Sequence, residues 1–325
     1  MGIKDRLLMK AKSSNNKLFK GIVFKIYDLL RYSRVIAFFR YKPWISDKKY
    51  IEKKYKRVFG EKPNLDCPRN FNEKNNWRKL YDRNDLYTKM VDKYQIKELI
   101  REKVGAEYTF PLIAAWDHPK DIDFDVLPNS FVLKVNHSGG VIVCRNKDSF
   151  DYKRAVWELK KEQRMACFPI SREWPYKNVR RKIICEQYMG ENLIDYKNYC
   201  FNGKVYYTFV WRNRSKEDGR KPEPYLCGAY DVNWEKKEIA LQYPSIDSVV
   251  ERPDCYNEMI RIAEKMSEGI PFVRVDCYVI DGKPYIGEMT FFPYGGFLKF
   301  EDQLWNNRFG DMEELPAINN RENFK

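Results

Sequence analysis

The stretch that decides the fold runs from residue 271 to residue 296 and reads PFVRVDCYVIDGKPYIGEMTFFPYGG. Apolar and polar residues alternate on both sides of Asp281-Gly282, which predicts two strands joined by a tight turn. One face of this hairpin is apolar, with Val273, Val275, Cys277, Val279, Tyr285, Met289 and Phe291. The other face carries Arg274, Asp276, Tyr278, Ile286, Glu288 and Thr290. The hairpin therefore has one face suited to a core and one face rich in polar groups.

The length of the turn determines which polar residues meet. A two-residue loop at Asp281-Gly282 would pair Asp276 with Gly287 and send Glu288 to the opposite face. A three-residue loop, which adds Ile280, keeps both carboxylates on one face. The same loop brings four polar side chains together: Arg274, Asp276, Glu288 and Thr290. We therefore expect the three-residue loop, with its glycine in the left-handed conformation.

Two carboxylates and a hydroxyl on one sheet surface are hard oxygen ligands. Asp276, Glu288 and Thr290 would suit a Mg2+ ion that also holds phosphate groups. The alternative is an edge hairpin whose polar face is simply solvated, as most charged faces are. The hairpin by itself leaves both interpretations open.

The composition restricts the class of protein. The chain has 325 residues, enough for one large domain or two, and a net charge of +14. Such a charge favours an acidic partner: a nucleotide, a polyanion or an anionic membrane surface. The eight cysteines include no CxxC pair, so we expect reduced core thiols rather than disulfides or a zinc site. No uncharged run is long enough to span a bilayer, and no signal peptide is evident.

The first 60 residues are basic and helical in pattern. Leu18, Ile22, Ile26 and Leu29 recur at helical spacing, with lysines and arginines between them. Such a segment can contact an anionic membrane surface through residues 1–45. It can also pack its apolar face on the body of the protein, and packing is the expectation that we carry forward.

A second informative stretch, FVLKVNHSGGVIVC, covers residues 131–144 and predicts a strand, a flexible loop and a strand. Lys134 points away from the apolar side chains of the first strand. The loop residues His137-Ser138-Gly139-Gly140 lack bulk, so their backbone N–H groups can approach phosphate oxygens. Lys134 would add a charge to the same phosphates, and we expect His137 to be a loop donor rather than a base. A plain hairpin with a glycine turn is the alternative.

Residues 71–105 are also helical in pattern, and by that pattern Lys93 and Lys97 are solvated. Farther along, Asp121 and Asp123 form an Asp-x-Asp sequence, which in many glycosyltransferases holds a metal and a sugar nucleotide. Because prolines bound this segment, we expect a turn or a helix start instead.

Two further segments follow the glycine loop. The run RKIICEQYM, residues 181–189, predicts a buried strand with a polar end. The next segment predicts a hairpin that turns at Asn202-Gly203. Asp195 and Lys197 share one face of the first strand of that hairpin.

The order of these pieces resembles the ATP-grasp superfamily, with a lysine strand, a glycine loop, a helix, a strand ending in Glu and a carboxylate hairpin. Within that superfamily, the sequence is similar to the TupA-like family, named for the teichuronopeptide biosynthesis protein TupA. Five runs within residues 70–300 carry the resemblance: FNEKNNWRKLYDRNDLYTKMVDKY, DIDFDVLPNSFVLKVNHSGG, SREWPYKNVRRKIICEQY, DYKNYCFNGKV and PFVRVDCYVIDGKPYIGEMTFFPYGG. One run would be weak evidence, whereas five in the right order are specific.

The resemblance implies an α+β ATP-grasp fold, in which two lobes clasp ATP. The expected parts are a basic helical segment over residues 1–60, a helical region over 61–130, a small lobe with the glycine-rich lid over 131–190, a large lobe with the carboxylate hairpin over 191–310, and a tail over 311–325. The region before the lysine strand is mostly helical here, unlike the α/β domain usual in the superfamily.

The resemblance also implies roles for residues. Those implied to bind ATP are Lys93, Lys134, His137, Ser138, Gly139, Gly140, the adenine hinge Glu186, Gln187 and Tyr188, and the ribose-binding Asp195, with Lys97 as the alternative to Lys93. Those implied to hold Mg2+ are Asp276, Glu288 and Thr290. Those implied to be catalytic are Arg274, Lys134 and Lys197. Thr290 departs from the pattern, since many members have Asn there, and a hydroxyl binds Mg2+ more weakly.

The chemistry that the resemblance implies is ATP-dependent ligation with Mg2+, in which a carboxylate is joined to an amine through an acyl phosphate. We expect a uronic acid of a capsular or O-antigen glycan as the carboxylate and an amino acid as the amine. The reverse direction, extension of a glutamyl chain, is also compatible. Arg212 and Arg214 are candidates for binding the substrate carboxylate. A lipid-linked glycan would put the protein in the cytoplasm, at the inner membrane face, with no nucleic-acid partner.

Two alternatives remain at this point. A glycosyltransferase using Asp121 and Asp123 would bind a sugar nucleotide and not ATP, but it leaves Lys134 and the hairpin carboxylates unexplained. The other alternative is a binding module that keeps the ATP-grasp fold without turnover. A phosphotransferase that stops at phosphate transfer is a third and weaker option.

Overall fold

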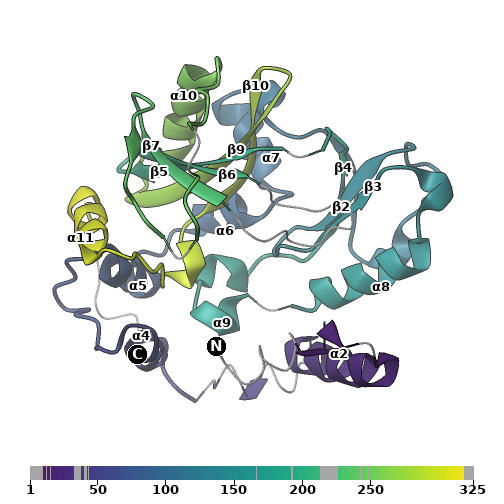
Figure 1. Cartoon of the computed structure of the whole chain (residues 1–325), viewed down its shortest axis with the longest axis horizontal. Helices are drawn as coiled ribbons and strands as arrows, with labels where there is room; N and C mark the ends of the chain where they lie inside the picture. The colour runs from purple at the N-terminus through teal and green to yellow at the C-terminus, as the bar shows by residue number, and fades with distance from the viewer. Residues whose placement is uncertain are drawn as a thin grey trace.

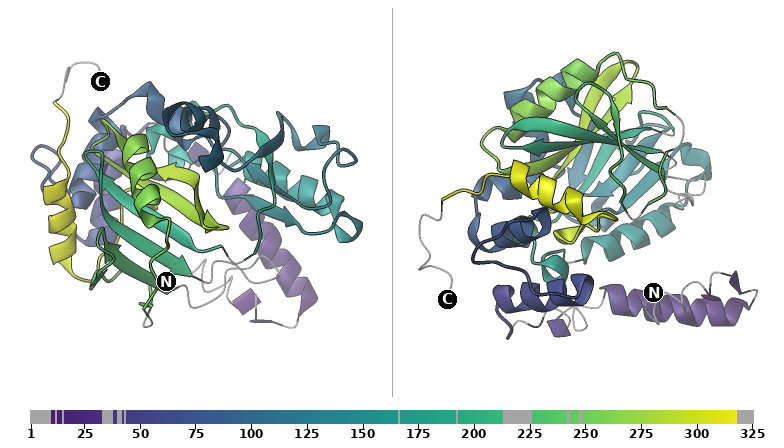
Figure 2. Two further views of the ribbon diagram at one scale, coloured as in Figure 1. Left: turned by 90° about the horizontal axis from the view of Figure 1, so that it is seen from above. Right: turned by 60° about the vertical axis from the view of Figure 1, so that its left-hand side comes forward.

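The computed structural model describes residues 10–317, except 12, 15, 33–37, 40, 41, 43, 166, 192, 213–225, 242, 247 and 248. Two antiparallel sheets form the body of the protein, and helices surround them (Figure 1). The two sheets lie in separate lobes, and the right-hand view of Figure 2 shows helices below them. The α+β architecture predicted from the sequence is confirmed.

The smaller sheet has four strands in the order β1-β4-β2-β3. Its strands are β1 (Leu112–Trp116), β2 (Phe131–Val135), β3 (Val141–Cys144) and β4 (Ile183–Gln187). Phe131, Leu133 and Val135 point to one face, where they form a core with Leu159 of helix α8 (Tyr152–Gln163). Lys134 therefore projects from the other face, as strand alternation predicted.

The larger sheet has six strands in the order β10-β9-β5-β6-β7-β8. Its strands are β5 (Asp195–Phe201), β6 (Lys204–Arg212), β7 (Leu226–Asp231), β8 (Lys236–Lys237), β9 (Phe272–Ile280) and β10 (Lys283–Thr290). One face packs on helix α10 (Tyr256–Ser267). The other face has a second core, in which Phe201 and Phe272 contact Phe71 of helix α5 (Phe71–Tyr81) and Phe309 of helix α11 (Gln303–Met312).

The remaining helices are α2 (Lys17–Tyr32), α4 (Asp47–Phe59), α5 (Phe71–Tyr81), α6 (Asp85–Val91), α7 (Ile96–Lys103), α9 (Phe168–Ser171) and α11 (Gln303–Met312). Short 3-10 turns cover Ala106–Tyr108, Pro119–Asp121, Lys147–Ser149, Trp174–Lys177 and Pro293–Gly295. Within the described ranges, no helix combines the length and the apolar character that crossing a membrane requires. All eight cysteines are unpaired, and six of them are buried, in agreement with the expected core thiols.

The helical pattern over residues 71–105 corresponds to three helices rather than one. The side chain of Asn84 caps α6 by accepting from the Leu86 N–H, and the carboxylate of Asp92 accepts from the Tyr94 N–H. Polar side chains of this kind compete for backbone N–H groups and so interrupt a helix. The second interruption matters for function, because it leaves Lys93 in a turn between α6 and α7.

The turn of the β9–β10 hairpin is shorter than predicted. Ile280 pairs with Lys283, so the loop has two residues, and both have positive φ, 49° at Asp281 and 72° at Gly282. This combination is typical of the type I′ turn that matches the twist of a hairpin. The expectation of a three-residue loop is therefore wrong.

A bulge in β10 nevertheless brings the two carboxylates to one face. The pairing register shifts between Ile286 and Glu288, so that Asp276 lies opposite Glu288. The extra residue is Gly287, where a Cβ atom would come within 2.6 Å of the Tyr278 ring. The shared face was predicted correctly but for the wrong reason, since the inserted residue lies in the strand and not in the turn.

The same bulge changes two assignments nearer the turn. Ile286 pairs with Cys277 and is buried in the core under α10, although it was predicted on the polar face. Tyr285 is on the opposite face, where its ring contacts Phe110. Strict alternation along the strand takes no account of a bulge. It therefore assigns the wrong face to the residues between Gly287 and the turn.

Candidate active site

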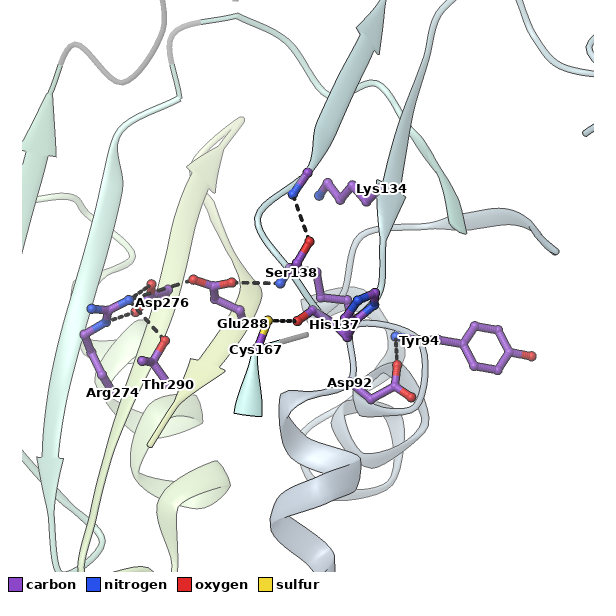
Figure 3. Close-up of polar contacts among 12 residues, drawn as sticks. Asp92, Tyr94, Lys134, His137, Ser138, Cys167, Arg274, Asp276, Glu288 and Thr290 are labelled. Carbon is purple, nitrogen blue, oxygen red and sulfur yellow. Dashed lines mark hydrogen bonds and ion pairs between the residues drawn. The ribbon is translucent and has the colours of Figure 1, made fainter. Parts of the chain in front are cut away.

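The polar face of the hairpin is a closely connected group. Arg274 donates to both carboxylate oxygens of Asp276, over 2.5 and 2.6 Å, and to the hydroxyl of Thr290 over 3.1 Å. A second carboxylate, Glu288, lies 3.8 Å from the same guanidinium. Figure 3 shows these four side chains together on the hairpin. Bidentate pairing holds the arginine in one orientation.

Strand β5 adds two residues to this group. Lys197 pairs with Asp276 across the sheet, and its Nζ lies 2.7 Å from a carboxylate oxygen of Asp276 and 2.7 Å from one of Asp195. Asp195 and Asp276 are both almost completely buried. Burial raises the pKa of the Asp276 carboxyl, and Arg274 and Lys197 oppose that shift. The lysine therefore bridges the predicted ribose-binding acid and a predicted metal ligand.

Lys93 reaches the hairpin from the turn between α6 and α7. Its Nζ lies 3.1 Å from a carboxylate oxygen of Glu288, and this contact lowers the pKa of Glu288 well below its usual range. The backbone N–H of Lys93 donates to the carbonyl of Asn136 at the end of β2. The side chain of Asn136 in turn donates to Asp92. The expectation that Lys93 is solvated is wrong, because the Asp92 turn directs it between the two sheets.

A second charged group lies on the smaller sheet. The carboxylate of Glu186 on β4 accepts from Lys134 at 2.5 Å and from Lys97 at 2.6 Å. Lys97 also donates to the carbonyl of Phe110, and Lys134 lies over the Phe110 ring. Burial raises the pKa of Glu186, but the two lysines outweigh it and lower that pKa overall. Lys97 is thus part of the Glu186 group, whereas Lys93 contacts the hairpin.

The glycine-rich loop joins β2 to β3 beside these lysines. His137 is buried, with Nε2 bonded to the carbonyl of Met165 over 3.0 Å. Burial and the nearby charge of Arg181 lower the pKa of His137 to about 4, so its ring is neutral near pH 7. The Ser138 hydroxyl accepts from the Gly140 N–H, and the Cβ position of Gly139 faces open space. The His137 ring is thus held by the backbone within the loop, and its role as a loop donor stays a prediction.

The predicted adenine hinge follows Glu186. Gln187 is exposed, and its backbone N–H donates to the carbonyl of Pro111 over 3.0 Å. The hydroxyl of Tyr188 contacts Glu191, which also pairs with Arg145. The adenine-binding role of these residues stays a prediction.

Two of the predicted residues lie away from these groups. Asp195 pairs with Trp211 across β5 and β6, so Arg212 projects from the opposite face, near Tyr196 in the core under α10. Arg212 therefore does not share a face with Asp195, and its substrate-binding role stays a prediction, while Arg214 lies outside the described residues. Asp123 accepts from the Asp125 N–H in an exposed turn, as its prolines suggested.

The sequence interpretation missed a buried polar face on helix α5. Asn76 donates to the carbonyl of Gly296 over 2.7 Å, and Lys79 donates to the carbonyl of Gly295. These contacts hold a loop in which Tyr294 has a positive φ of 54°. Spacing was an available signal, since Asn72, Asn76 and Lys79 recur at i, i+4 and i+7 on one helical face.

That loop brings Tyr294 close to the hairpin group and to Tyr199 of β5. Burial raises the pKa of Tyr294, whose neighbours are Tyr199, Tyr243 and Arg274. Burial also raises the pKa of Tyr199, which lies beside Arg274. Strained backbone of this kind, a non-glycine residue at positive φ, is found most often at active sites and ligand-binding sites.

The donor set fits a magnesium ion only in combination with phosphate. Asp276 and Glu288 offer carboxylate oxygens from paired positions, and cations that keep Glu288 ionised surround them. In the part of the chain that the structure describes, no group of three or more His, Cys, Asp or Glu side chains is arranged to hold a metal. Two carboxylates plus phosphate oxygens are the usual arrangement for Mg2+ at nucleotide sites.

Comparison with known proteins gives a family and several solved structures. Residues 73–313 match the family model described as TupA-like ATPgrasp. D-alanine–D-alanine ligase from Bacillus anthracis is similar at 20% identity, over 62% of this chain and 56% of the ligase, with a TM-score of 0.37. An L-amino acid ligase from Bacillus licheniformis is similar at 11% identity, over 73% and 46%, with a TM-score of 0.40. A search of curated proteins found no match.

The phosphoribosylamine–glycine ligase of Thermotoga maritima is also similar, at 13% identity over 63% of this chain and 48% of the ligase, with a TM-score of 0.39. The matched part spans about half the length of each of these enzymes. The family model covers most of the chain, including the lysine strand, the glycine loop and the carboxylate hairpin. This protein belongs to the TupA-like family of ATP-grasp proteins.

Proposed function

We propose that the protein is an ATP-dependent ligase that joins a carboxylate to an amine through an acyl phosphate. The observation that carries the proposal is the group formed by Lys93, Arg274, Asp276 and Glu288, which includes cations and carboxylates within 4 Å of one another. Such a group can bind triphosphate oxygens and a substrate carboxylate at once. Lys134 provides a further cation from the facing sheet.

The proposed reaction has two steps. The substrate carboxylate attacks the γ-phosphorus of ATP, the bond to the β–γ bridging oxygen breaks, and ADP leaves. The amine then attacks the acyl carbon, phosphate departs with the electron pair of the C–O bond, and the amine loses a proton to solvent. The first step activates a carboxylate that is otherwise a poor electrophile.

Each residue has a part in these steps. Arg274, held by Asp276, would donate to the acyl oxygen as negative charge develops on it. Lys93 and Lys134 would bind the phosphates, and the N–H groups at Gly139 and Gly140 would cover them and exclude water. Asp276 and Glu288 would hold Mg2+, with Thr290 as a weaker ligand, and the ion would neutralise charge on the β- and γ-phosphate oxygens.

We further propose that the carboxylate belongs to a uronic acid of a cell-surface polysaccharide and that the amine is an amino acid. The net charge of +14 supports an anionic substrate of this kind. The family resemblance to teichuronopeptide biosynthesis supports a link between sugar acids and amino acids. The direction of amide formation is the part that an activity assay decides.

The test begins with nucleotide binding. The purified protein is heated with Mg2+ and a non-hydrolysable ATP analogue, or with UDP-sugars, and the unfolding temperatures are compared. We expect stabilisation by the ATP analogue only, and its loss in Glu288→Gln but not in the exposed-turn control Asp123→Asn. Release of ADP is then measured with polyuronates and each amino acid. Stabilisation by UDP-sugars instead of the ATP analogue would refute the ligase proposal.

A further inference from the structure

Helix α2 presents an apolar stripe to solvent. Leu18, Ile22 and Ile26 lie one turn apart on one side of the helix, and they are 74%, 50% and 51% exposed. A helix packed on the body of the protein would bury this stripe. The packing expected from the sequence is therefore wrong for these residues, and the stripe is free to bind something else.

A cluster of exposed aromatic rings follows the helix in sequence. Phe38, Phe39 and Trp44 are all more than half exposed. The ring of Phe38 lies 5.8 Å from that of Phe39 and 6.1 Å from that of Trp44. Aromatic residues gathered on a surface beside an amphipathic helix are typical of proteins that insert into the interface of a bilayer.

Helix α4 supplies positive charge along the same edge of the molecule. Figure 1 and the right-hand view of Figure 2 show α2 and α4 along one edge, below the two sheets. Ile51 and Tyr55 attach α4 to the body, and Lys54 donates to the carbonyl of Ile170. The outward side of α4 carries five exposed cations: Lys48, Lys49, Lys53, Lys56 and Arg57. This edge is therefore both apolar and basic.

We propose that the edge formed by α2, the aromatic cluster and α4 binds the surface of a bilayer that contains anionic phospholipids. The apolar stripe and the rings would enter the acyl boundary, while the lysines of α4 contact the headgroups. A second copy of this chain is a poorer occupant, because it would bring the same basic surface against this one. The inference is independent of the proposed ligase reaction.

The test is flotation of the full-length protein with vesicles of phosphatidylcholine alone or mixed with phosphatidylglycerol. We expect flotation only with the anionic vesicles, weakened by 0.5 M salt. Lys49→Gln/Lys53→Gln should lower partitioning by about 10- to 30-fold, since each basic residue near the surface contributes about fivefold. The matched control Lys265→Gln/Lys283→Gln, on α10 and the hairpin tip at the opposite edge in Figure 1, should bind like the wild type.

A second pair of variants tests the apolar contribution. Ile22→Glu/Ile26→Glu should lower partitioning by at least about tenfold. Val126→Glu/Val249→Glu, which changes two residues that are also exposed, should leave partitioning unchanged. The circular dichroism spectrum and the thermal unfolding midpoint, both without nucleotide, are measured on every variant to show that each is folded. Equal binding to both vesicle types, or no binding, would overturn the proposal. A wild-type dimer that Ile22→Glu/Ile26→Glu converts to a monomer would also overturn it, since the stripe would then be a self-interface.

Discussion

The charged groups on the two sheets differ in their balance of charge. On the larger sheet, three cations (Lys93, Lys197 and Arg274) contact three carboxylates, Asp195, Asp276 and Glu288. On the smaller sheet, Lys97 and Lys134 share the single carboxylate of Glu186. The small-sheet group therefore has one more cation than carboxylates. In the large-sheet group the cations and carboxylates are equal in number.

This difference suggests a division of labour. A surplus cation on a partly exposed side chain, such as Lys134, is available to an anionic phosphate. In the balanced group, Asp195, Asp276, Lys197 and Arg274 are buried, and removing one of these charges leaves the others unpaired in a medium of low dielectric constant, so each holds its partners in position. The small-sheet group would thus attract the nucleotide, and the large-sheet group would orient it.

The largest expected effect comes from breaking the balance on the larger sheet. Asp276→Asn leaves Arg274 and Lys197 without their shared carboxylate, so the free energy of unfolding should fall by about 3–5 kcal/mol. Urea denaturation measures it. The control Glu191→Gln removes an exposed carboxylate that pairs with Arg145, and it should cost less than about 1 kcal/mol. Equal losses in the two variants would contradict the buried-balance argument.

A pH titration tests the glycine-rich loop next to the two groups. Burial lowers the pKa of His137 to about 4 from a usual value near 6.5, and the charges of Arg181 and Lys93 add to this shift. The folded state therefore favours the neutral ring, and this stability is complete above about pH 6.5 and is lost as the pH falls towards 4. The loss should reach about 3 kcal/mol at and below pH 4. His137→Asn should remove this part of the pH dependence, and an unchanged profile would show that another group titrates.

The bulge that brings the carboxylates together gives an intermediate effect. Gly287→Ala would bring a Cβ within 2.6 Å of the Tyr278 ring, so we expect a loss of about 1–3 kcal/mol and weaker binding of the ATP analogue with Mg2+. Gly139→Ala, whose Cβ meets nothing within 4 Å, is the stability control. Adding Tyr278→Ala to Gly287→Ala should relieve the clash. If it restores neither stability nor binding, the steric explanation fails.

The smallest expected change in stability accompanies the loss of the surplus charge itself. Lys134→Met leaves Glu186 paired with Lys97, so the free energy of unfolding should change by less than about 1 kcal/mol. Stabilisation by the ATP analogue should nevertheless disappear. Lys197→Met is the contrast, because it leaves two buried carboxylates without their bridging lysine and should destabilise the fold more. Retained nucleotide binding in Lys134→Met would refute the idea that the small-sheet group attracts the nucleotide.

Much of the site could be predicted because it depends on local periodicity. Alternation in β2 placed Lys134 opposite the core residues Phe131 and Leu133, and the structure agrees. The turn residues Asn202-Gly203 were also correct, since Phe201 pairs with Lys204. Such features are determined within a few residues, where the conformational preferences of glycine, asparagine and the pleated strand act directly.

The predictions were wrong where contacts between segments far apart in the chain determine the position of a side chain. Lys93 was indistinguishable by pattern from a solvated lysine, but a turn made by Asp92 and tied to Asn136 directs it to Glu288. The charge of Arg212 likewise gave no sign that the register of β5 and β6 puts it on the opposite face from Asp195. The polar residues of α5 are buried because they bind a loop more than two hundred residues away in sequence.

The sequence by itself thus determined the strands that carry the site, the turn at Asn202-Gly203 and the family, because these depend on short-range patterns that the chain carries locally. Tertiary structure alone decided how Asp276 and Glu288 meet, through the bulge at Gly287, and which lysine joins each carboxylate. The physical reason is that charge pairing in a buried site depends on positions within a few ångströms, and packing of segments far apart in the chain sets those positions.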